Sequence, residues 1–132
     1  MKIKIIILLL TILTTSIQYY WFLPHGRFCS DPIDNNIWLP LLFILFLIFI
    51  GTTLIIMFSK KKLLIKLSLF LTLFWLFFNY QSFNDRVSCW STYLFYEEIS
   101  EVLSLSLIPI GICLTIFILG YFFLRKLLKV NE

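Results

Sequence analysis

Four long apolar stretches restrict the folds that this sequence can adopt. They cover about residues 5–23, 37–58, 63–80 and 102–124, and hydrophobic residues make up 61% of the 132-residue chain. A transmembrane helix needs about 20 consecutive apolar residues, and a soluble domain of this size could not bury so many Leu, Ile and Phe side chains. We therefore predict an all-α fold, a single four-helix transmembrane bundle formed by residues 1–132.

The positions of the Lys and Arg residues predict how the four stretches are oriented. Nine of the eleven lie beside stretch ends that would face one side of a membrane, whereas six of the seven acids lie in segments 24–36 and 81–101. Basic loops remain in the cytoplasm during insertion, so we predict that both termini are cytoplasmic and that the two acidic segments are outer loops. The nine basic residues are Lys2, Lys4, Lys60, Lys61, Lys62, Lys66, Arg125, Lys126 and Lys129. Of these nine, we expect five to determine the topology: Lys60, Lys61, Lys62, Arg125 and Lys126.

The net charge of +4 has two interpretations. Nucleic-acid binding would require a basic stripe on one surface, but here the cations are grouped at the ends of apolar stretches. Cations in such places orient the chain and attract anionic lipid headgroups. We therefore expect the lipid bilayer as a partner and no nucleic acid.

The first stretch also resembles a secretory signal peptide, because two lysines precede an uninterrupted apolar block. A signal peptide should end in small residues. This stretch ends instead in Gln18, Tyr19, Tyr20 and Trp21, and such aromatic residues are typical of an interfacial anchor. We favour an uncleaved helix that ends before Pro24.

Several residues inside the stretches bear on helix packing. Gly51, Thr52 and Thr53 form a small patch that a neighbouring helix could approach closely. Pro109 removes a backbone hydrogen bond, so the fourth helix should bend there, which we interpret as packing geometry rather than a gate. Lys66 lies one turn beyond three consecutive lysines. We expect its ammonium group to reach the interface, with a functional buried cation as the alternative.

The outer loop 81–101 should be partly helical. Trp90, Leu94 and Ile99 fall near one face, with Glu97, Glu98 and Glu101 displaced from it. This pattern predicts a short amphipathic helix that lies on the membrane surface or leads into the fourth stretch.

The three cysteines differ in their expected surroundings. Cys113 falls in the middle of the fourth stretch, where it should act as a small apolar residue. Cys29 and Cys89 lie one in each outer loop, so a disulfide between them is plausible on the oxidising side of a bacterial plasma membrane. Such a bridge would close a loop of about 60 residues and stabilise the fold by roughly 3–4 kcal/mol.

Thiol–disulfide exchange is the alternative role for Cys29 and Cys89. Four-helix oxidoreductases of the disulfide-bond-forming and vitamin-K-epoxide-reductase types resemble this chain in size and helix number. They rely on a C-x-x-C pair, in which one thiol attacks and the other resolves, and the sequence contains no such pair. We therefore favour a structural disulfide.

Metal-binding and catalytic motifs are weak or missing in the sequence. His25 is the single histidine, and its nearest potential co-ligands, Cys29, Asp31 and Asp34, show no known metal-site spacing. There is also no phosphate-binding glycine loop, nucleophile elbow or H-E-x-x-H motif. We predict no enzyme activity, cofactor or metal.

A transport function needs ionisable groups inside the membrane. Apart from Lys66 the four stretches carry no charge, whereas small multidrug transporters of similar length depend on a Glu in the first helix. The first stretch offers hydroxyls and one amide, which we expect to bond across helices for about 0.5–2 kcal/mol each. These residues are Thr11, Thr14, Thr15, Ser16 and Gln18.

About half of the chain, from Cys29 to Trp90, resembles the small, uncharacterised bacterial inner-membrane proteins of the YjeO type. The matching features are an outer-loop cysteine, a Leu-Pro-Leu-Leu-Phe entry to a helix, a basic turn, and an aromatic helix that leads to Tyr-Gln and Cys-Trp. They correspond to Cys29, Leu39-Pro40-Leu41-Leu42-Phe43, Lys60-Lys61-Lys62, Tyr80-Gln81 and Cys89-Trp90. The resemblance implies a bacterial inner-membrane location and supports the cysteine pair. The role of that family is unknown, so no activity follows, and the fourth stretch is an addition here.

Three functions remain open from the sequence. The first is a non-enzymatic multi-pass protein that acts by contact with another membrane protein or as a homo-oligomer, for example as an immunity protein against a pore-forming bacteriocin. The second is a membrane thiol–disulfide oxidoreductase that uses Cys29 and Cys89. The third is a small transporter component, which would need a polar stripe along a pathway.

Overall fold

The computed structural model describes residues 2–29, 36–59 and 62–129, and these contain helices and no strand. The four long helices are α1 (Lys2–Phe22), α2 (Trp38–Phe58), α3 (Leu63–Arg86) and α4 (Phe95–Lys129), with a short 3₁₀ helix, η1 (Ser88–Trp90), after α3. All four long helices are long and apolar enough to cross a membrane. The predicted all-α, four-helix fold is thereby confirmed.

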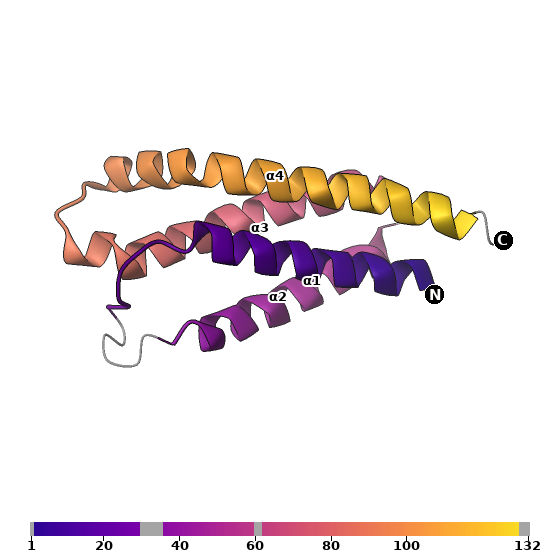
Figure 1. The fold of residues 1–132 in the computed structure, drawn as a ribbon, viewed down its shortest axis with the longest axis horizontal. Coiled ribbons are helices and arrows are strands. Elements are labelled where there is room, and N and C mark those ends of the chain that lie inside the picture. Colours follow the sequence, from indigo (N-terminus) through magenta and orange to yellow (C-terminus); the bar gives the residue numbers. More distant parts are fainter. Residues whose placement is uncertain (1, 30–35, 60–61, 130–132) are drawn as a thin grey trace.

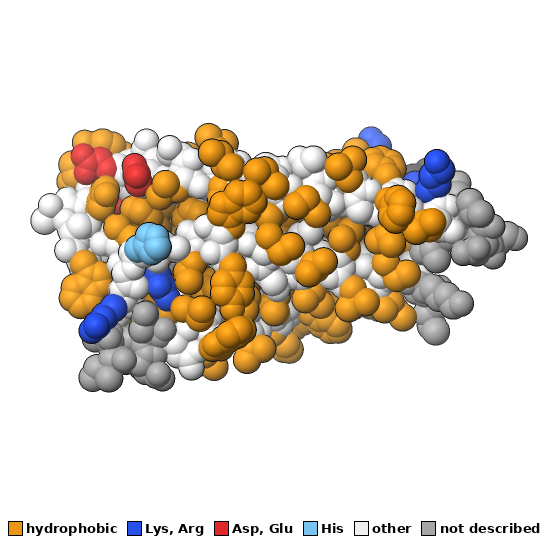
Figure 2. Space-filling model, viewed as in Figure 1, with side chains coloured by type: hydrophobic (Ala, Val, Ile, Leu, Met, Phe, Trp, Pro, Cys, Tyr) orange, Lys and Arg blue, Asp and Glu red, His pale blue; other side chains and the backbone are white. Residues whose placement is uncertain are grey.

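The helices form an elongated bundle in which chain neighbours run antiparallel, so both termini lie at the same end (Figure 1). α1 packs against α2 and α4, and α3 packs against the same two helices. The end that carries the termini holds the described cations Lys4, Lys62, Lys66, Arg125 and Lys126, and we call it the basic end. The opposite end, which carries Cys29 and Cys89, is called the disulfide end. A broad apolar band separates the charged groups of the two ends (Figure 2).

The connections follow from local sequence. α1 stops just before Pro24, which has no N–H to continue a helix. Pro40 lies in the first turn of α2, where an N–H has no partner within the helix. Lys62 adopts the left-handed conformation (φ 55°, ψ 36°) immediately before α3. α4 continues through Pro109.

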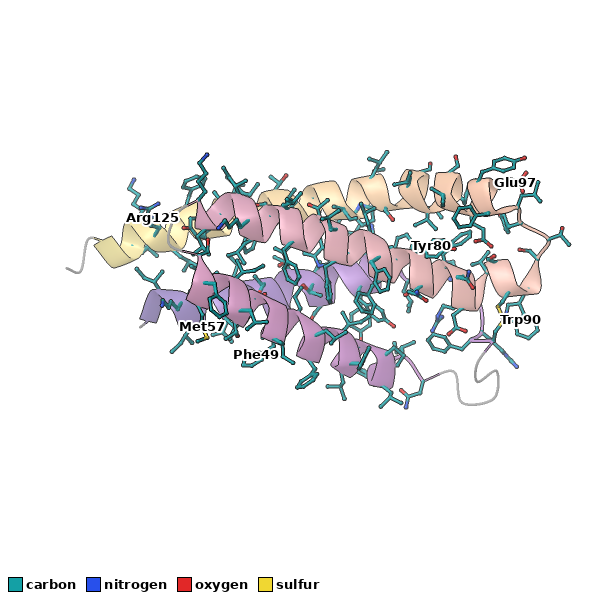
Figure 3. The ribbon with its side chains drawn as sticks, turned by 180° about the vertical axis from the view of Figure 1, so that it is seen from behind. Phe49, Met57, Tyr80, Trp90, Glu97 and Arg125 are labelled. Carbon is teal, nitrogen blue, oxygen red and sulfur yellow. A yellow bond between two sulfur atoms is a disulfide. The ribbon has the colours of Figure 1, made fainter. Side chains whose placement is uncertain are left out.

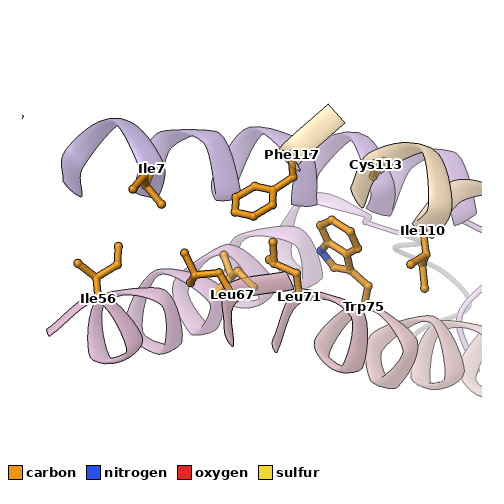
Figure 4. Close-up of a cluster of buried hydrophobic side chains, with 9 residues drawn as sticks. Ile7, Ile56, Leu67, Leu71, Trp75, Ile110, Cys113 and Phe117 are labelled. Atoms are coloured by element: carbon orange, nitrogen blue, oxygen red, sulfur yellow. The ribbon is translucent and has the colours of Figure 1, made fainter. Parts of the chain in front are cut away.

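All four helices contribute to the main apolar core (Figure 4). Its largest fully buried side chains are Trp75 and Phe117, which lie with the thiol of Cys113. Large apolar side chains also cover the outside of the bundle, including Leu9, Phe46 and Leu69. Apolar residues on both the inside and the outside are typical of helices that contact lipid.

Two glycines permit close contacts inside the bundle. An added Cβ at Gly51 would collide with the ring of Phe70 in α3, and one at Gly120 would approach Leu10 of α1 to 3.1 Å. The small patch predicted at Gly51 therefore packs against a neighbouring helix of the same chain, with Thr52 fully buried beside it.

The segment 81–101 is more helical than a loop. α3 continues to Arg86 because Phe83 and Arg86 are buried on its inner face. After η1, residues 95–101 form the first turns of α4. Trp90 and Leu94 are exposed, whereas Glu98 is buried.

Candidate functional site

The disulfide end is held together by links between distant segments. Cys29, after α1, forms a disulfide with Cys89 of η1, and their Cα atoms are 6.5 Å apart, within the usual range for such bridges. The backbone N–H of Cys29 donates to the carbonyl of Asp85 at 2.9 Å. The indole N–H of Trp90 donates to the carbonyl of Arg27 at 3.0 Å. The α1–α2 connection is thereby fastened to the α3–α4 connection.

Arg86 organises the chain that follows α1. Its side chain is only 5% exposed, and Nη1 donates to the carbonyls of Gly26 at 3.0 Å and Pro24 at 3.4 Å. Its guanidinium carbon lies 3.9 Å from the centroid of the Phe28 ring, a cation–π contact. Gly26 has φ +144°, and an added Cβ there would collide with the backbone of Arg86. Only glycine allows this close approach.

Glu98 is a buried carboxylate in the first turns of α4. It accepts hydrogen bonds from the hydroxyl of Ser88 in η1 and from that of Tyr80 in α3, the latter at 3.3 Å. Burying a carboxylate is costly unless donors replace its lost hydration. Here two hydroxyls do so, and they attach the start of α4 to α3 and η1. Figure 3 shows Tyr80 within the bundle and Trp90 and Glu97 at the disulfide end, opposite Arg125.

A chain of amides and hydroxyls crosses the middle of the bundle. Gln18 in α1 donates from Nε2 to Oδ1 of Asn79 in α3 at 2.8 Å, and Asn79 donates from Nδ2 to the hydroxyl of Ser106 in α4 at 2.9 Å. All three side chains are buried. One turn away, the indole N–H of Trp75 donates to the hydroxyl of Thr15 at 3.1 Å. These hydrogen bonds join α1, α3 and α4, because each amide bonds to a side chain of another helix.

The expectation for the polar groups of the first helix is confirmed for two of them. Gln18 and Thr15 bond across helices as predicted. The prediction of bonds across helices is wrong for Thr11, Thr14 and Ser16, because their hydroxyls donate to carbonyls three or four residues earlier in α1. A hydroxyl inside a helix can always reach such a carbonyl, so it needs no neighbouring helix.

The remaining predicted residues are spread over the molecule. Cys113 is buried in the main core. His25 is exposed at the disulfide end, and no group of three His, Cys, Asp or Glu side chains suited to a metal occurs among the described residues. Asp31 and Asp34, considered as co-ligands of His25, lie outside the described residues, as do Lys60 and Lys61.

The burial of Arg86, Glu98 and Asn79 was not predicted from the sequence. Arg86 fell in the outer loop 81–101, Glu98 was placed off the apolar face of a short amphipathic helix, and Asn79 fell in the third apolar stretch. Asn79 is the one amide between Leu63 and Tyr80, and such a residue in an apolar environment usually hydrogen-bonds to another helix. For Arg86, the pairing with Gly26 could not be read from the sequence because it lies 60 residues away.

Comparison with known proteins gave no match: no protein-family model, curated protein or solved structure is significantly similar to this chain.

Proposed function

We propose that this chain is a non-enzymatic, multi-pass protein of a bacterial inner membrane that acts by lateral contact with another membrane protein. Four helices of sufficient length and apolarity support membrane insertion. The grouping of cations at the end with both termini supports cytoplasmic termini. A disulfide at the opposite end fits the oxidising outer side of such a membrane.

The contact itself is inferred from the outward face of α4. At Gly111 no described atom outside the adjoining backbone of α4 lies within 4 Å of the position that a Cβ would occupy, whereas a Cβ at Gly51 or Gly120 would meet a side chain of another helix. Ser104 and Thr115 are also exposed on α4, and the Thr115 hydroxyl is bonded back to the Gly111 carbonyl at 2.8 Å. Small residues permit close approach of a second helix within a membrane. This unused space at Gly111 is the observation that carries the proposal.

The form of the proposal that best fits a small protein of this kind is immunity to a pore-forming bacteriocin. A toxin of that class inserts helices into the inner membrane. A helix of the toxin, packed along Gly111 and Thr115, would be held in an inactive position without any catalytic residue. A resemblance to the YjeO type agrees with the proposed location and adds nothing on the partner.

Photo-crosslinking in native membranes tests the contact. A photoreactive residue is placed at Ile108, which is exposed on α4, and in a separate variant at Leu69, which is similarly exposed on α3. We expect a protein adduct from position 108 and only lipid adducts from position 69. Adding Gly111→Ile should remove the adduct, because a bulky side chain prevents close helix approach.

The matched control is Leu119→Ile, which changes another exposed position of α4 without filling the space at Gly111. The adduct should persist in that variant. Equal adducts from positions 108 and 69, or an adduct that is insensitive to Gly111→Ile, would contradict the proposal. An adduct that contains only two copies of this chain would show self-association in place of a different partner.

One observation favours a second function. Cys89 is exposed, so an external thiolate could reach its sulfur, as thiol–disulfide exchange requires. A membrane oxidoreductase that uses Cys29 and Cys89 is therefore the alternative, and the cysteine substitutions described in the Discussion separate it from a structural bridge.

A further inference from the structure

A cavity of about 490 Å³ opens at the basic end, between the start of α1, the end of α4 and the turn that joins α2 to α3. Its walls are apolar, with Ile7, Leu63 and Leu124 among them, and its polar groups include Lys4, Lys62 and Arg125. The volume falls within the range of about 300–1,000 Å³ that is usual for small-molecule sites.

The three cations come from three separate parts of the chain and meet no opposing charge in the cavity. None of the described residues that line it is acidic. The described acids lie at the disulfide end. Asp85 is in the last turn of α3, and Glu97, Glu98 and Glu101 are in the first turns of α4. Two helices also begin here: Leu63 is the first residue of α3, and Lys4 lies in the first turn of α1. Helix starts carry partial positive charge, but α2 and α4 end on this side with the opposite partial charge, so the attraction for an anion rests on the three cations.

The cavity is also continuous with the apolar outside of the bundle. Ile3 lines it and is 38% exposed. Ile6 and Leu124, partly exposed lining residues on the inner side of Lys4 and Arg125, give an apolar portion of a ligand a path toward the sides of the bundle. A site with cations at the end of a bundle, and an apolar exit toward its sides, matches a molecule with an anionic head and a hydrocarbon chain.

We propose that this cavity binds one anionic phospholipid, with its phosphate between Lys4, Lys62 and Arg125. The guanidinium of Arg125 can donate two parallel hydrogen bonds to phosphate oxygens, and the two ammonium groups add compact charge. The acyl chain would leave past Ile6 and Leu124 into the bilayer. This inference does not depend on the partner proposed for α4.

Native mass spectrometry of the purified protein, titrated with phosphatidylglycerol or phosphatidylcholine in detergent, tests the site. We expect one phosphatidylglycerol per chain and much weaker binding of phosphatidylcholine. Arg125→Gln should weaken phosphatidylglycerol binding at least about tenfold, because its charge-assisted hydrogen bonds to the phosphate are lost. Arg125→Lys, which keeps the charge, should recover part of that loss.

Lys126→Gln is the matched control, because Lys126 is the exposed neighbour of Arg125 and does not line the cavity. It removes the same charge from the same end and should change binding less than about twofold, since it contributes only screened long-range attraction. Equal loss in the two variants would overturn the proposal in favour of diffuse attraction. If Arg125→Gln does not fold, Lys4→Gln replaces it, because Lys4 is exposed on the first turn of α1.

A soluble anion distinguishes a lipid site from a phosphate site. Glycerol 3-phosphate carries the same phosphate without acyl chains, and we expect it neither to displace phosphatidylglycerol nor to raise the unfolding temperature at equal concentration. Equal competition by glycerol 3-phosphate, or equal binding of the two phospholipids, would overturn the proposal.

Discussion

Trp75→Ala is expected to lower the free energy of unfolding by about 3–5 kcal/mol, the usual cost of removing a large aromatic side chain from a packed core. Trp75 is 1% exposed and packs with Leu71 and Phe117. Its indole N–H also donates to the hydroxyl of Thr15 in α1 at 3.1 Å. The substitution therefore leaves a cavity between α1 and α3 and removes a hydrogen bond between these helices. Unfolding in mixed micelles, followed by helical circular dichroism, measures the loss.

Two variants serve as controls for the Trp75 prediction. Trp75→Phe keeps an aromatic ring but loses the N–H, so it should cost much less, with about 0.6–1.7 kcal/mol for the hydrogen bond itself. Phe77→Ala removes a ring from the same helix at a position that is 56% exposed, and it should change the free energy by about 0.5 kcal/mol or less. Equal losses of unfolding free energy for Trp75→Ala and Phe77→Ala would contradict the burial of Trp75 on the inner face of α3.

Removing the disulfide is expected to cost about 3–4 kcal/mol through the lost restriction on the unfolded chain. Cys29 and Cys89 are separated by 60 positions in the sequence, and their bridge joins the two connections at the disulfide end. The Cys29→Ser/Cys89→Ser variant should unfold at a lower denaturant concentration than the oxidised protein. Reductant should produce the same shift in the unsubstituted protein and none in the double variant.

Single cysteine variants decide between a structural bridge and an oxidoreductase. If the bridge is structural, Cys29→Ser, Cys89→Ser and the double variant should be equally destabilised, and the adduct from Ile108 should persist in all three. An oxidoreductase would instead lose thiol oxidation in each variant while its unfolding curve stayed near that of the parent. Cys113→Ala is the control, because Cys113 is buried in the main core away from the bridge.

The helices were predictable from the sequence because their cause is local. Each apolar run is long enough to cross a bilayer, and prolines or lysines mark several of the ends. For this reason the four-helix, all-α fold was confirmed. α3 continues past the predicted apolar stretch 63–80 to Arg86, because Phe83 and Arg86 are buried on its inner face.

The buried polar contacts were mostly not predictable because their partners come from distant segments. Gln18 and Asn79 are 61 positions apart, and helical periodicity alone does not show which faces meet. Glu98 lies between Glu97 and Glu101, and nothing in its own segment distinguishes it. It is buried because Ser88 and Tyr80 supply donors. The disulfide between Cys29 and Cys89 was easier to predict, because a four-helix bundle places both residues after helices that end on the same side.

Thiol labelling of intact cells tests most directly whether α4 crosses the membrane with the basic end of the bundle inside. Single cysteines are introduced by Leu94→Cys and Leu127→Cys in a Cys29→Ser/Cys89→Ser/Cys113→Ala background. Both positions are exposed and lie at opposite ends of the bundle, and both substitutions leave every Lys and Arg in place. A membrane-impermeant maleimide should label Leu94→Cys in intact cells and Leu127→Cys only after the membrane is permeabilised. Labelling of Leu127→Cys in intact cells, or of both positions equally, would contradict the account.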